Sequence, residues 1–202
     1  MPDLLNIEGV SLAFGGVAAL EDVSVTVREG TITALIGPNG AGKTSLFNVI
    51  SGFYRPSRGA VSFGGADILA LPAHRRSRLG IARTFQNIAL FAGMSVLENI
   101  KLGAHDQLRA NVFSAGIYLG WARREETALT RRIDRDVIEF LDLGDIRDRP
   151  IAGLPYGLQK RVEIARALVM RPRLLLLDEP VAGMNAAEKS AMGGYIRRCV
   201  AE

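Results

Sequence analysis

The sequence predicts an α/β fold with a strand-rich start, a helical middle, and a final apolar strand followed by a helix. Three observations favour this fold. Short apolar or alternating runs rich in β-branched residues fill the first third of the chain. Helix start signals and amphipathic runs occupy residues 95–170. Residues 174–177 are apolar throughout, which predicts a strand buried on both faces.

The expected strands follow from short runs bounded by glycine. They cover residues 5–10, 23–27, 32–36, 60–63 and 81–85. A helix over residues 43–50 is expected to stop at Gly52, and a second over residues 72–79 starts with proline and stops at Gly80.

The expected helices of the second half carry clearer signals. Ser95 with Glu98, and Asn185 with Glu188, form capping boxes that predict two helix starts. An amphipathic helix is expected over residues 123–141, and another over residues 157–170. The apolar face of the first comprises Leu129, Ile133, Val137 and Phe140.

Composition excludes several classes of protein. The chain has 202 residues, of which 48% are hydrophobic, so it can bury the core of one domain. No apolar run is long enough to span a membrane, and the acidic start is unlike a signal peptide. The single Cys199 fits a reducing compartment, and a cytoplasmic protein is expected. The net charge is +4, but the arginines are scattered, so solvated helix faces are expected and no nucleic acid partner.

A glycine-rich loop carries the strongest chemical signal. Gly37-Pro38-Asn39-Gly40-Ala41-Gly42-Lys43-Thr44 matches the phosphate-binding pattern at every fixed position, between an expected strand and an expected helix. Glycines let backbone N–H groups surround an anion, and the helix N-terminus adds partial positive charge. Lys43 would reach the outer phosphates of ATP, and the Thr44 hydroxyl would coordinate Mg²⁺.

Two acids end the apolar strand over residues 174–177. Ligands of open α/β sheets bind at this end of a strand. Asp178 would hold Mg²⁺, directly or through water, and Glu179 would act as general base on the attacking water. A solvated turn with two ordinary acids is the alternative, and the phosphate-binding loop makes it the weaker reading.

The segment between these two motifs resembles the signature of ABC transporter ATP-binding subunits. It runs from Leu154 through Pro155, Tyr156, Gly157, Leu158 and Gln159 into a helix. Gln86 matches the family's Q-loop, Phe14 matches the aromatic that stacks on adenine, and residues 181–185 look like the D-loop. Residues 52–56, 83–87 and 182–185 and the signature variant are similar to the ATPases of branched-chain amino-acid importers.

The resemblance implies a fold and a set of site residues. The fold is a P-loop NTPase of ABC type, with a mixed β-sheet core, an antiparallel β subdomain and a helical signature subdomain. The core would comprise residues 1–88 and 171–202, and the helical subdomain residues 89–170. Nucleotide would be bound by Phe14, Pro38, Asn39, Gly40, Ala41, Gly42, Lys43, Thr44, Ser45 and Gln86. Mg²⁺ would be bound by Thr44, Gln86 and Asp178.

The family's cycle implies partners. A second ABC ATPase subunit, identical or different, would face this one, so that each signature helix meets the nucleotide of the other chain. Membrane-embedded permease subunits would dock on the helical subdomain, and residues 112–121 border that surface or pack in the core. A periplasmic or extracellular solute-binding protein would act indirectly. The chain would lie at the cytoplasmic face of the plasma membrane.

Two departures from the family pattern stand out. Pro155, Tyr156 and Leu158 replace the serine, first glycine and glutamine of the usual signature. Since proline supplies neither hydroxyl nor N–H, contact with the γ-phosphate would come from Gly157 and neighbouring backbone. The family's switch histidine is also not matched, because His74 and His105 lie far upstream. We therefore expect that a C-terminal segment is missing, that the chain as it stands hydrolyses ATP poorly, and that both histidines lie at the surface.

Two alternative functions remain open at this stage. A non-transport ABC ATPase acting on DNA or ribosomes would need a long coiled coil or a second cassette, and the sequence shows neither. A nucleotide-binding module without turnover is the other alternative. The transported solute and the direction of transport cannot be read from these residues.

Overall fold

The structure is a computed structural model that describes residues 2–84, 89–104 and 119–201. Contacts divide the chain into two compact units. The first comprises Met1–Arg83 with Ile196–Glu202, and the second comprises Thr84–Tyr195. The division into core and helical subdomain that we expected from the sequence remains a prediction.

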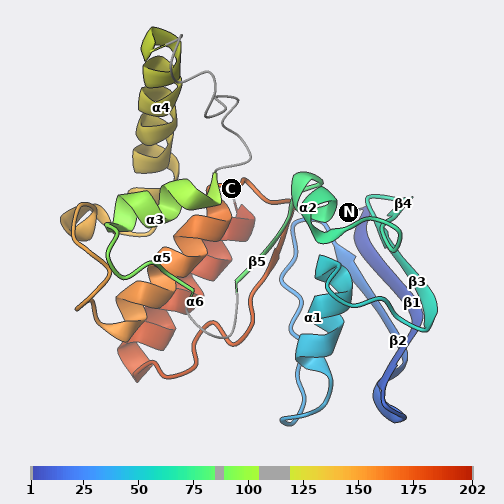
Figure 1. The fold of residues 1–202 in the computed structure, drawn as a ribbon. Helices are drawn as coiled ribbons and strands as arrows, with labels where there is room; N and C mark the ends of the chain where they lie inside the picture. Colours follow the sequence, from blue (N-terminus) through green and yellow to red (C-terminus); the bar gives the residue numbers. More distant parts are fainter. Residues whose placement is uncertain (1, 85–88, 105–118, 202) are drawn as a thin grey trace. The chain divides into compact units, whose positions relative to one another are not determined.

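The first unit contains a four-stranded antiparallel sheet in the order β2-β1-β3-β4 (Figure 1). Its strands are β1 (Asp3–Phe14), β2 (Val17–Arg28), β3 (Arg58–Phe63) and β4 (Ala66–Asp67). Gly15 and Gly16, both with positive φ, connect β1 to β2 in a tight hairpin, with Phe14 opposite Val17. Ile7, Val10 and Val61 are fully buried and form part of its core.

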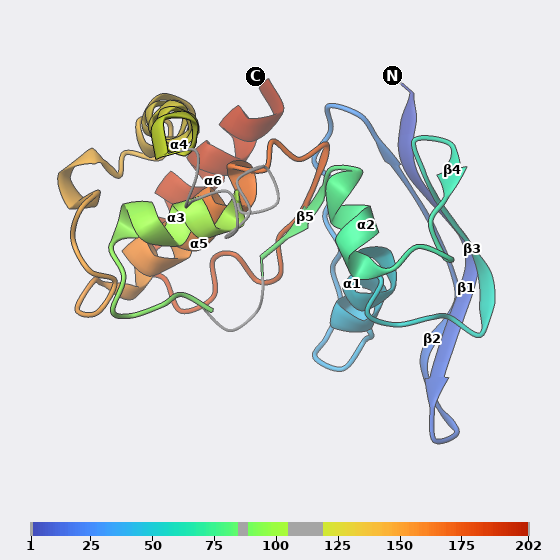
Figure 2. The same cartoon turned by 45° about the horizontal axis from the view of Figure 1, so that its top comes forward.

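Two helices of the first unit, α1 (Lys43–Ser51) and α2 (Ala73–Arg78), lie on one side of the sheet (Figures 1 and 2). The short strand β5 (Ile81–Arg83) follows α2. Gly52 ends α1 in the left-handed conformation, as the glycine stop predicts. His74 is exposed, as expected, whereas His105 lies outside the described residues.

Arg76 corrects the expectation that the arginines lie on solvated helix faces. It is 2% exposed and donates from Nη1 to the carbonyls of Val49 and Ile50, at 2.5 and 3.0 Å. Both carbonyls belong to the last turn of α1, and that of Val49 also accepts from the Gly52 N–H at 3.2 Å. Burial lowers the pKa of the Arg76 guanidinium, although Asp67 opposes the shift. Arg76 therefore caps α1 from α2.

The expected strand over residues 32–36 is wrong for this structure. Residues 31–38 carry no strand or helix assignment, and Ile32 and Ile36 are 54% and 90% exposed. A β-strand requires a neighbour with which its backbone groups pair. The described residues provide no such ladder for this segment.

The second unit is mainly helical. Its helices are α3 (Val96–Gly103), α4 (Leu119–Ile133), α5 (Tyr156–Leu168) and most of α6 (Ala186–Ala201). A three-residue strand, β6 (Leu174–Leu176), precedes α6. Both expected capping boxes form, Ser95 with Glu98 and Asn185 with Glu188. A side chain at Gly103 would overlap the carbonyl oxygen of Arg166, so a glycine lets α3 approach α5 closely.

Two expectations for the second unit are corrected. The helix expected over residues 123–141 is α4 followed by a π-helical turn, Asp134–Ile138, in which Glu139 N–H donates to the Asp134 carbonyl. Arg147 binds the Asp134 carboxylate at 2.7 Å at this irregular point. The apolar face is buried at Leu129, Ile133 and Val137.

The strand before the acid pair also differs from expectation. Within β6 only Leu176 is buried, while Leu174 and Leu175 are half-buried. The prediction of burial on both faces is therefore wrong. An apolar run indicates that a segment is buried, but it does not show whether one face or both faces of the strand are covered.

Candidate nucleotide-binding and catalytic site

The phosphate-binding loop depends on two glycines in the left-handed conformation. Gly40 has a φ of 84° and Gly42 a φ of 82°. A Cβ atom at Gly42 would overlap the carbonyl oxygen of Ala19, whereas one at Gly40 would meet nothing within 4 Å. Gly42 is also the N-cap of α1, so the loop leads directly into the helix N-terminus. Only glycine satisfies both the backbone conformation and the space at this position.

Lys43 folds back over the loop that precedes it. Its Nζ donates to the carbonyls of Gly37 and Pro38, at 2.6 and 2.8 Å. Thr44, the next residue, is exposed, and the described first turn of α1 contains no acidic side chain. The partial positive charge of the helix N-terminus is therefore opposed by no local carboxylate. An ammonium group and helix N–H groups thus converge on a solvent-accessible loop, which suits an anion such as phosphate.

Phe14 is available for stacking. Its side chain is 48% exposed at the end of β1, and its ring packs edge-on against Tyr54, with ring centroids 5.0 Å apart. An exposed aromatic held by a second aromatic suits the flat face of a base. Our sequence reasoning assigned Phe14 but missed Tyr54 as its support. The signal was present, because Tyr54 belongs to one of the segments that carried the family resemblance.

The acid pair places two carboxylates in contrasting surroundings. Asp178 is 5% exposed, and its backbone N–H donates to Thr84 Oγ1 at 3.4 Å. Thr84, itself 3% exposed, donates its own N–H to the carbonyl of Leu176. Glu179 is exposed and has a φ of 48°, a conformation that glutamate rarely adopts. A fixed, buried aspartate suits a metal ligand, and an exposed, strained glutamate suits a group that meets substrate.

Thr84 is a site residue whose role the sequence reasoning missed. It stood within the segment Arg83-Thr84-Phe85-Gln86-Asn87, which we used only for the family resemblance. The structure shows it bonded to the strand end that carries Asp178. Gln86, assigned to nucleotide and Mg²⁺, lies outside the described residues.

The signature segment forms the start of α5. Pro155 is the N-cap, and the N–H groups of Leu158 and Gln159 donate to its carbonyl at 3.0 and 3.1 Å. The amide of Gln159 donates to the Leu154 carbonyl at 2.8 Å, which closes the turn. Tyr156 is 44% exposed, whereas Gly157 is buried. The first turn of α5 holds no acidic residue, so this helix N-terminus also suits an anion.

The expected site residues fall into two groups. Phe14 and the phosphate-binding loop belong to the first unit; the acid pair and the signature belong to the second. The Thr44 hydroxyl and the Asp178 carboxylate are oxygen donors of the kind that Mg²⁺ prefers. Within the described ranges no group of three or more His, Cys, Asp or Glu could hold a metal ion. Each of these two donors by itself suits Mg²⁺, which keeps several waters and uses few protein ligands.

Residues 20–182 match the ABC transporter family, and the chain belongs to it. It is the ATP-binding protein of an ABC transporter, an ATP hydrolase, and this family uses ATP with Mg²⁺. The ABC fold expected from the sequence, including its antiparallel β subdomain, is confirmed. None of the described helices is long and apolar enough to cross a membrane.

Individual relatives show which members of the family this chain resembles. The chain is 41% identical to the high-affinity branched-chain amino acid transport ATP-binding protein LivG of Salmonella typhimurium, over 96% of this chain and 75% of that protein. It is 38% identical to the corresponding protein BraF of Pseudomonas aeruginosa, over 98% and 78%. A solved nucleotide-free ATP-binding cassette from an ABC transporter matches with a TM-score of 0.84 and 33% identity, over 99% and 78%. A cassette solved in its ADP conformation matches with a TM-score of 0.85 and 33% identity, over 100% and 78%.

Proposed function

We propose that this chain hydrolyses ATP to power an importer of branched-chain or related amino acids. The observation that carries the proposal is its identity of 38–41%, over nearly the whole chain, to ATP-binding proteins named for branched-chain amino acid transport. The signature variant Leu154-Pro155-Tyr156-Gly157 also resembles the ATPases of branched-chain amino-acid importers. The solute itself would be selected by other subunits of the transporter.

The chemistry follows from the two groups of site residues. Lys43 would exchange its two loop carbonyls for the β- and γ-phosphates of ATP, and Phe14 would stack on adenine. Thr44, Gln86 and Asp178 would hold Mg²⁺, which supplies charge stabilisation for the phosphates. Glu179, exposed to solvent, would accept a proton from the attacking water. The remaining loop residues Pro38, Asn39, Gly40, Ala41, Gly42 and Ser45 would line the phosphates.

A second ABC ATPase subunit would complete the site. The N-terminus of α5, with Leu154, Pro155, Tyr156, Gly157, Leu158 and Gln159, would face the γ-phosphate held by that partner. The first turn of α5 itself contains no acidic residue, and the N–H groups of this helix end would stabilise the phosphate charge while Glu188 of α6 lies beside Gly157. Permease subunits would convert closure of the two ATPase subunits into movement across the membrane. The chain would thus lie at the cytoplasmic face of the plasma membrane, with a solute-binding protein acting indirectly.

The test is uptake of radiolabelled leucine by membrane vesicles that carry this protein with the permease subunits encoded beside it. We expect ATP-dependent uptake with the full-length protein and none with its Glu179→Gln variant, which keeps the shape of the side chain but cannot accept a proton. Glu179→Gln should still bind ATP. Glu139→Gln removes another exposed acid of the same unit and should transport like the parent.

Two results would separate the parts of the proposal. ATP hydrolysis without uptake of any branched-chain amino acid would reject the solute class and leave the ATPase assignment intact. Hydrolysis by Glu179→Gln at the parent rate would reject Glu179 as the base.

A further inference from the structure

The ring of Tyr156 covers a glycine of the D-loop, residues 181–185. Gly183 has a φ of 74°, and a Cβ atom there would lie 3.1 Å from Tyr156 Cε1 and 3.6 Å from its Cδ1 and Cζ. Tyr156 is the first residue of α5 and stands where the usual signature has a glycine. The substituted position is therefore in contact with the backbone of another functional loop in the same unit.

A second contact joins the same two segments one residue further along. Glu188 is held by the capping box with Asn185, since each residue's backbone N–H donates to the other's side chain at 3.0 Å. A Cβ atom at Gly157 would lie 2.5 Å from Glu188 Oε1. The start of α6 therefore meets the first turn of α5 closely, and a larger residue at position 157 would require the Glu188 side chain to move. Tyr156–Gly183 and Gly157–Glu188 together form what we call the signature clamp.

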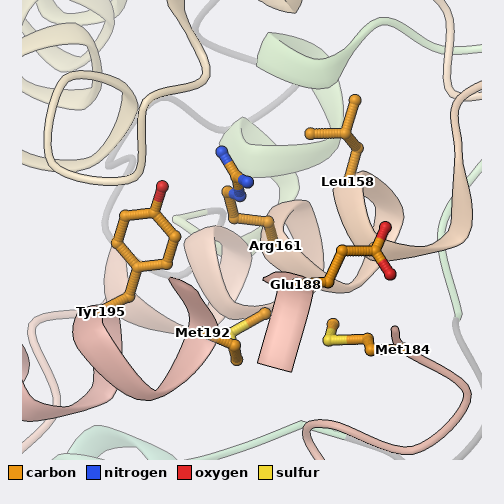
Figure 3. A pocket seen from close by; sticks show the side chains of 7 residues that line it. Leu158, Arg161, Met184, Glu188, Met192 and Tyr195 are labelled. Atoms are coloured by element: carbon orange, nitrogen blue, oxygen red, sulfur yellow. The ribbon is translucent and has the colours of Figure 1, made fainter. Parts of the chain in front are cut away.

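The second turn of α5 also contacts α6. Figure 3 shows a pocket between the two helices, with Arg161 and Tyr195 on its lining. The Arg161 guanidinium carbon lies 4.9 Å from the centre of the Tyr195 ring, and the Tyr195 hydroxyl donates to Asp142 at 2.8 Å. Because Arg161 and Tyr195 hold α5 to α6 without Tyr156, a change at Tyr156 should affect the D-loop without releasing α6 from α5.

The D-loop begins directly after the proposed base. Two consecutive turns connect them: Ala182 N–H donates to the Glu179 carbonyl at 3.2 Å, and Met184 N–H to the Val181 carbonyl at 3.4 Å. Glu179 itself has positive φ, so its conformation depends on the residues that follow it. Only three residues separate the glycine under the Tyr156 ring from Glu179.

We propose that Tyr156 is a positioning residue that holds the D-loop against the first turn of the signature helix. Movement of that helix on binding nucleotide is thereby carried through Gly183 to Glu179. We assign the contact to the ring, because the three atoms nearest to a Cβ at Gly183 are ring carbons. This inference rests on the proposed ATPase function, in which the signature helix and Glu179 act on nucleotide.

The test compares two glycines in the left-handed conformation. Gly183 has Tyr156 above it, whereas a Cβ atom at Gly153, with a φ of 87°, would meet nothing within 4 Å. We expect Gly183→Ala to lower kcat for ATP hydrolysis by ~10- to 100-fold with little change in KM. Gly153→Ala reports the cost of the backbone conformation alone and should lower kcat less. In a Tyr156→Ala background the added methyl has space, so Gly183→Ala should cost no more than Gly153→Ala.

The aromatic ring is tested by Tyr156→Phe, which should retain more of the parent kcat than Tyr156→Ala, and by Tyr156→Ala, which should lower it about as much as Gly183→Ala. Additive effects of Tyr156→Ala and Gly183→Ala would overturn the proposal, because residues that act through one contact must show coupling. A loss of activity in Tyr156→Phe equal to that in Tyr156→Ala would also overturn it.

Amide hydrogen exchange tests whether Tyr156 holds the D-loop, independently of ATP turnover. Amide hydrogen exchange over residues 181–185 should be faster in Tyr156→Ala than in the parent and unchanged in Tyr156→Phe. Equal exchange in all three proteins would refute the signature clamp even if the parent hydrolyses ATP. If the full-length parent proves unable to hydrolyse ATP, the proposed role of Glu179 fails, and the exchange result still shows whether the clamp exists.

Discussion

The hydroxyl of Thr84 accepts a hydrogen bond from the backbone N–H of Asp178 at 3.4 Å, while the N–H of Thr84 donates to the carbonyl of Leu176 at 3.0 Å. Both side chains are at least 95% buried. Thr84 therefore forms two hydrogen bonds to the end of the strand that carries Asp178, one through its hydroxyl and one through its backbone N–H. A carboxylate that coordinates a metal must be held at a fixed place, and this pair of bonds provides the constraint.

Thr84→Val tests that constraint. The change keeps the shape of the side chain but leaves the Asp178 N–H without its hydroxyl acceptor, which should cost about 1–3 kcal/mol of stability. We also expect the Mg²⁺ concentration needed for half-maximal ATP hydrolysis to rise. Thr84→Ser keeps the hydroxyl and should restore the parent response in a Mg²⁺ titration. Equal titration curves for valine and serine would assign Thr84 to packing alone.

Lys43→Ala should weaken ATP binding by about 10- to 100-fold, because it removes a charge-assisted hydrogen bond to the phosphates. The fold should persist, since the lysine bonds only to the loop carbonyls of Gly37 and Pro38. Titration with a fluorescent ATP analogue measures the affinity. Lys189→Ala, which removes an exposed lysine of α6, is the control and should bind like the parent. Unchanged affinity in Lys43→Ala would contradict the phosphate-loop assignment.

Gly42→Ala and Gly40→Ala form a matched pair, since the two residues share nearly the same φ. Each change should cost about 1–2 kcal/mol for the left-handed backbone. Gly42→Ala should cost about 1–3 kcal/mol more, because its methyl group would overlap the Ala19 carbonyl. Chemical denaturation of the two variants measures the difference. Similar losses of stability would show that Ala19 moves aside without cost.

Arg76→Met should destabilise the protein by about 2–3 kcal/mol, because the Ile50 carbonyl loses its guanidinium donor and the Val49 carbonyl keeps only the Gly52 N–H. Arg75→Met changes an exposed arginine of the same helix and should stay within about 0.5 kcal/mol of the parent. Thermal unfolding of both variants provides the comparison. Equal effects would mean that water replaces the Arg76 guanidinium at these carbonyls.

Glu98→Gln should change the acid sensitivity of the protein. Hydrogen bonds from the backbone N–H and then the hydroxyl of Ser95 lower the pKa of Glu98 below its ordinary value of 4.5. A carboxyl group whose pKa is lower in the folded protein stabilises it above the unfolded pKa, and this contribution is lost as pH falls through the folded pKa. The variant should therefore be less stable than the parent at neutral pH, and the difference should shrink below about pH 4.

Melting temperatures measured between about pH 7 and about pH 3 test this expectation. Glu21→Gln, which alters an exposed acid on β2, should follow the parent at every pH. A constant difference between Glu98→Gln and the parent would show that the charge of Glu98 does not contribute.

Local sequence determined the elements whose stabilising contacts lie within a few residues. The capping boxes at Ser95 and Asn185 form as predicted because both partners of each box lie on one helical turn. The glycine stop at Gly52 and the left-handed glycines of the phosphate-binding loop were equally predictable, because glycine is the residue that most readily adopts positive φ. The family followed from motifs of this local kind.

Tertiary structure decided what depends on residues far apart in the chain. Residues 32–36 have the composition of a strand, but pairing requires a neighbour that local sequence cannot specify. Arg76 resembles any helix-surface arginine until α2 packs against the end of α1 and buries it. Thr84 meets Asp178, and Tyr156 meets Gly183, only after folding. Burial and distant contacts arise from the whole chain at once, so the pattern along a segment does not reveal them.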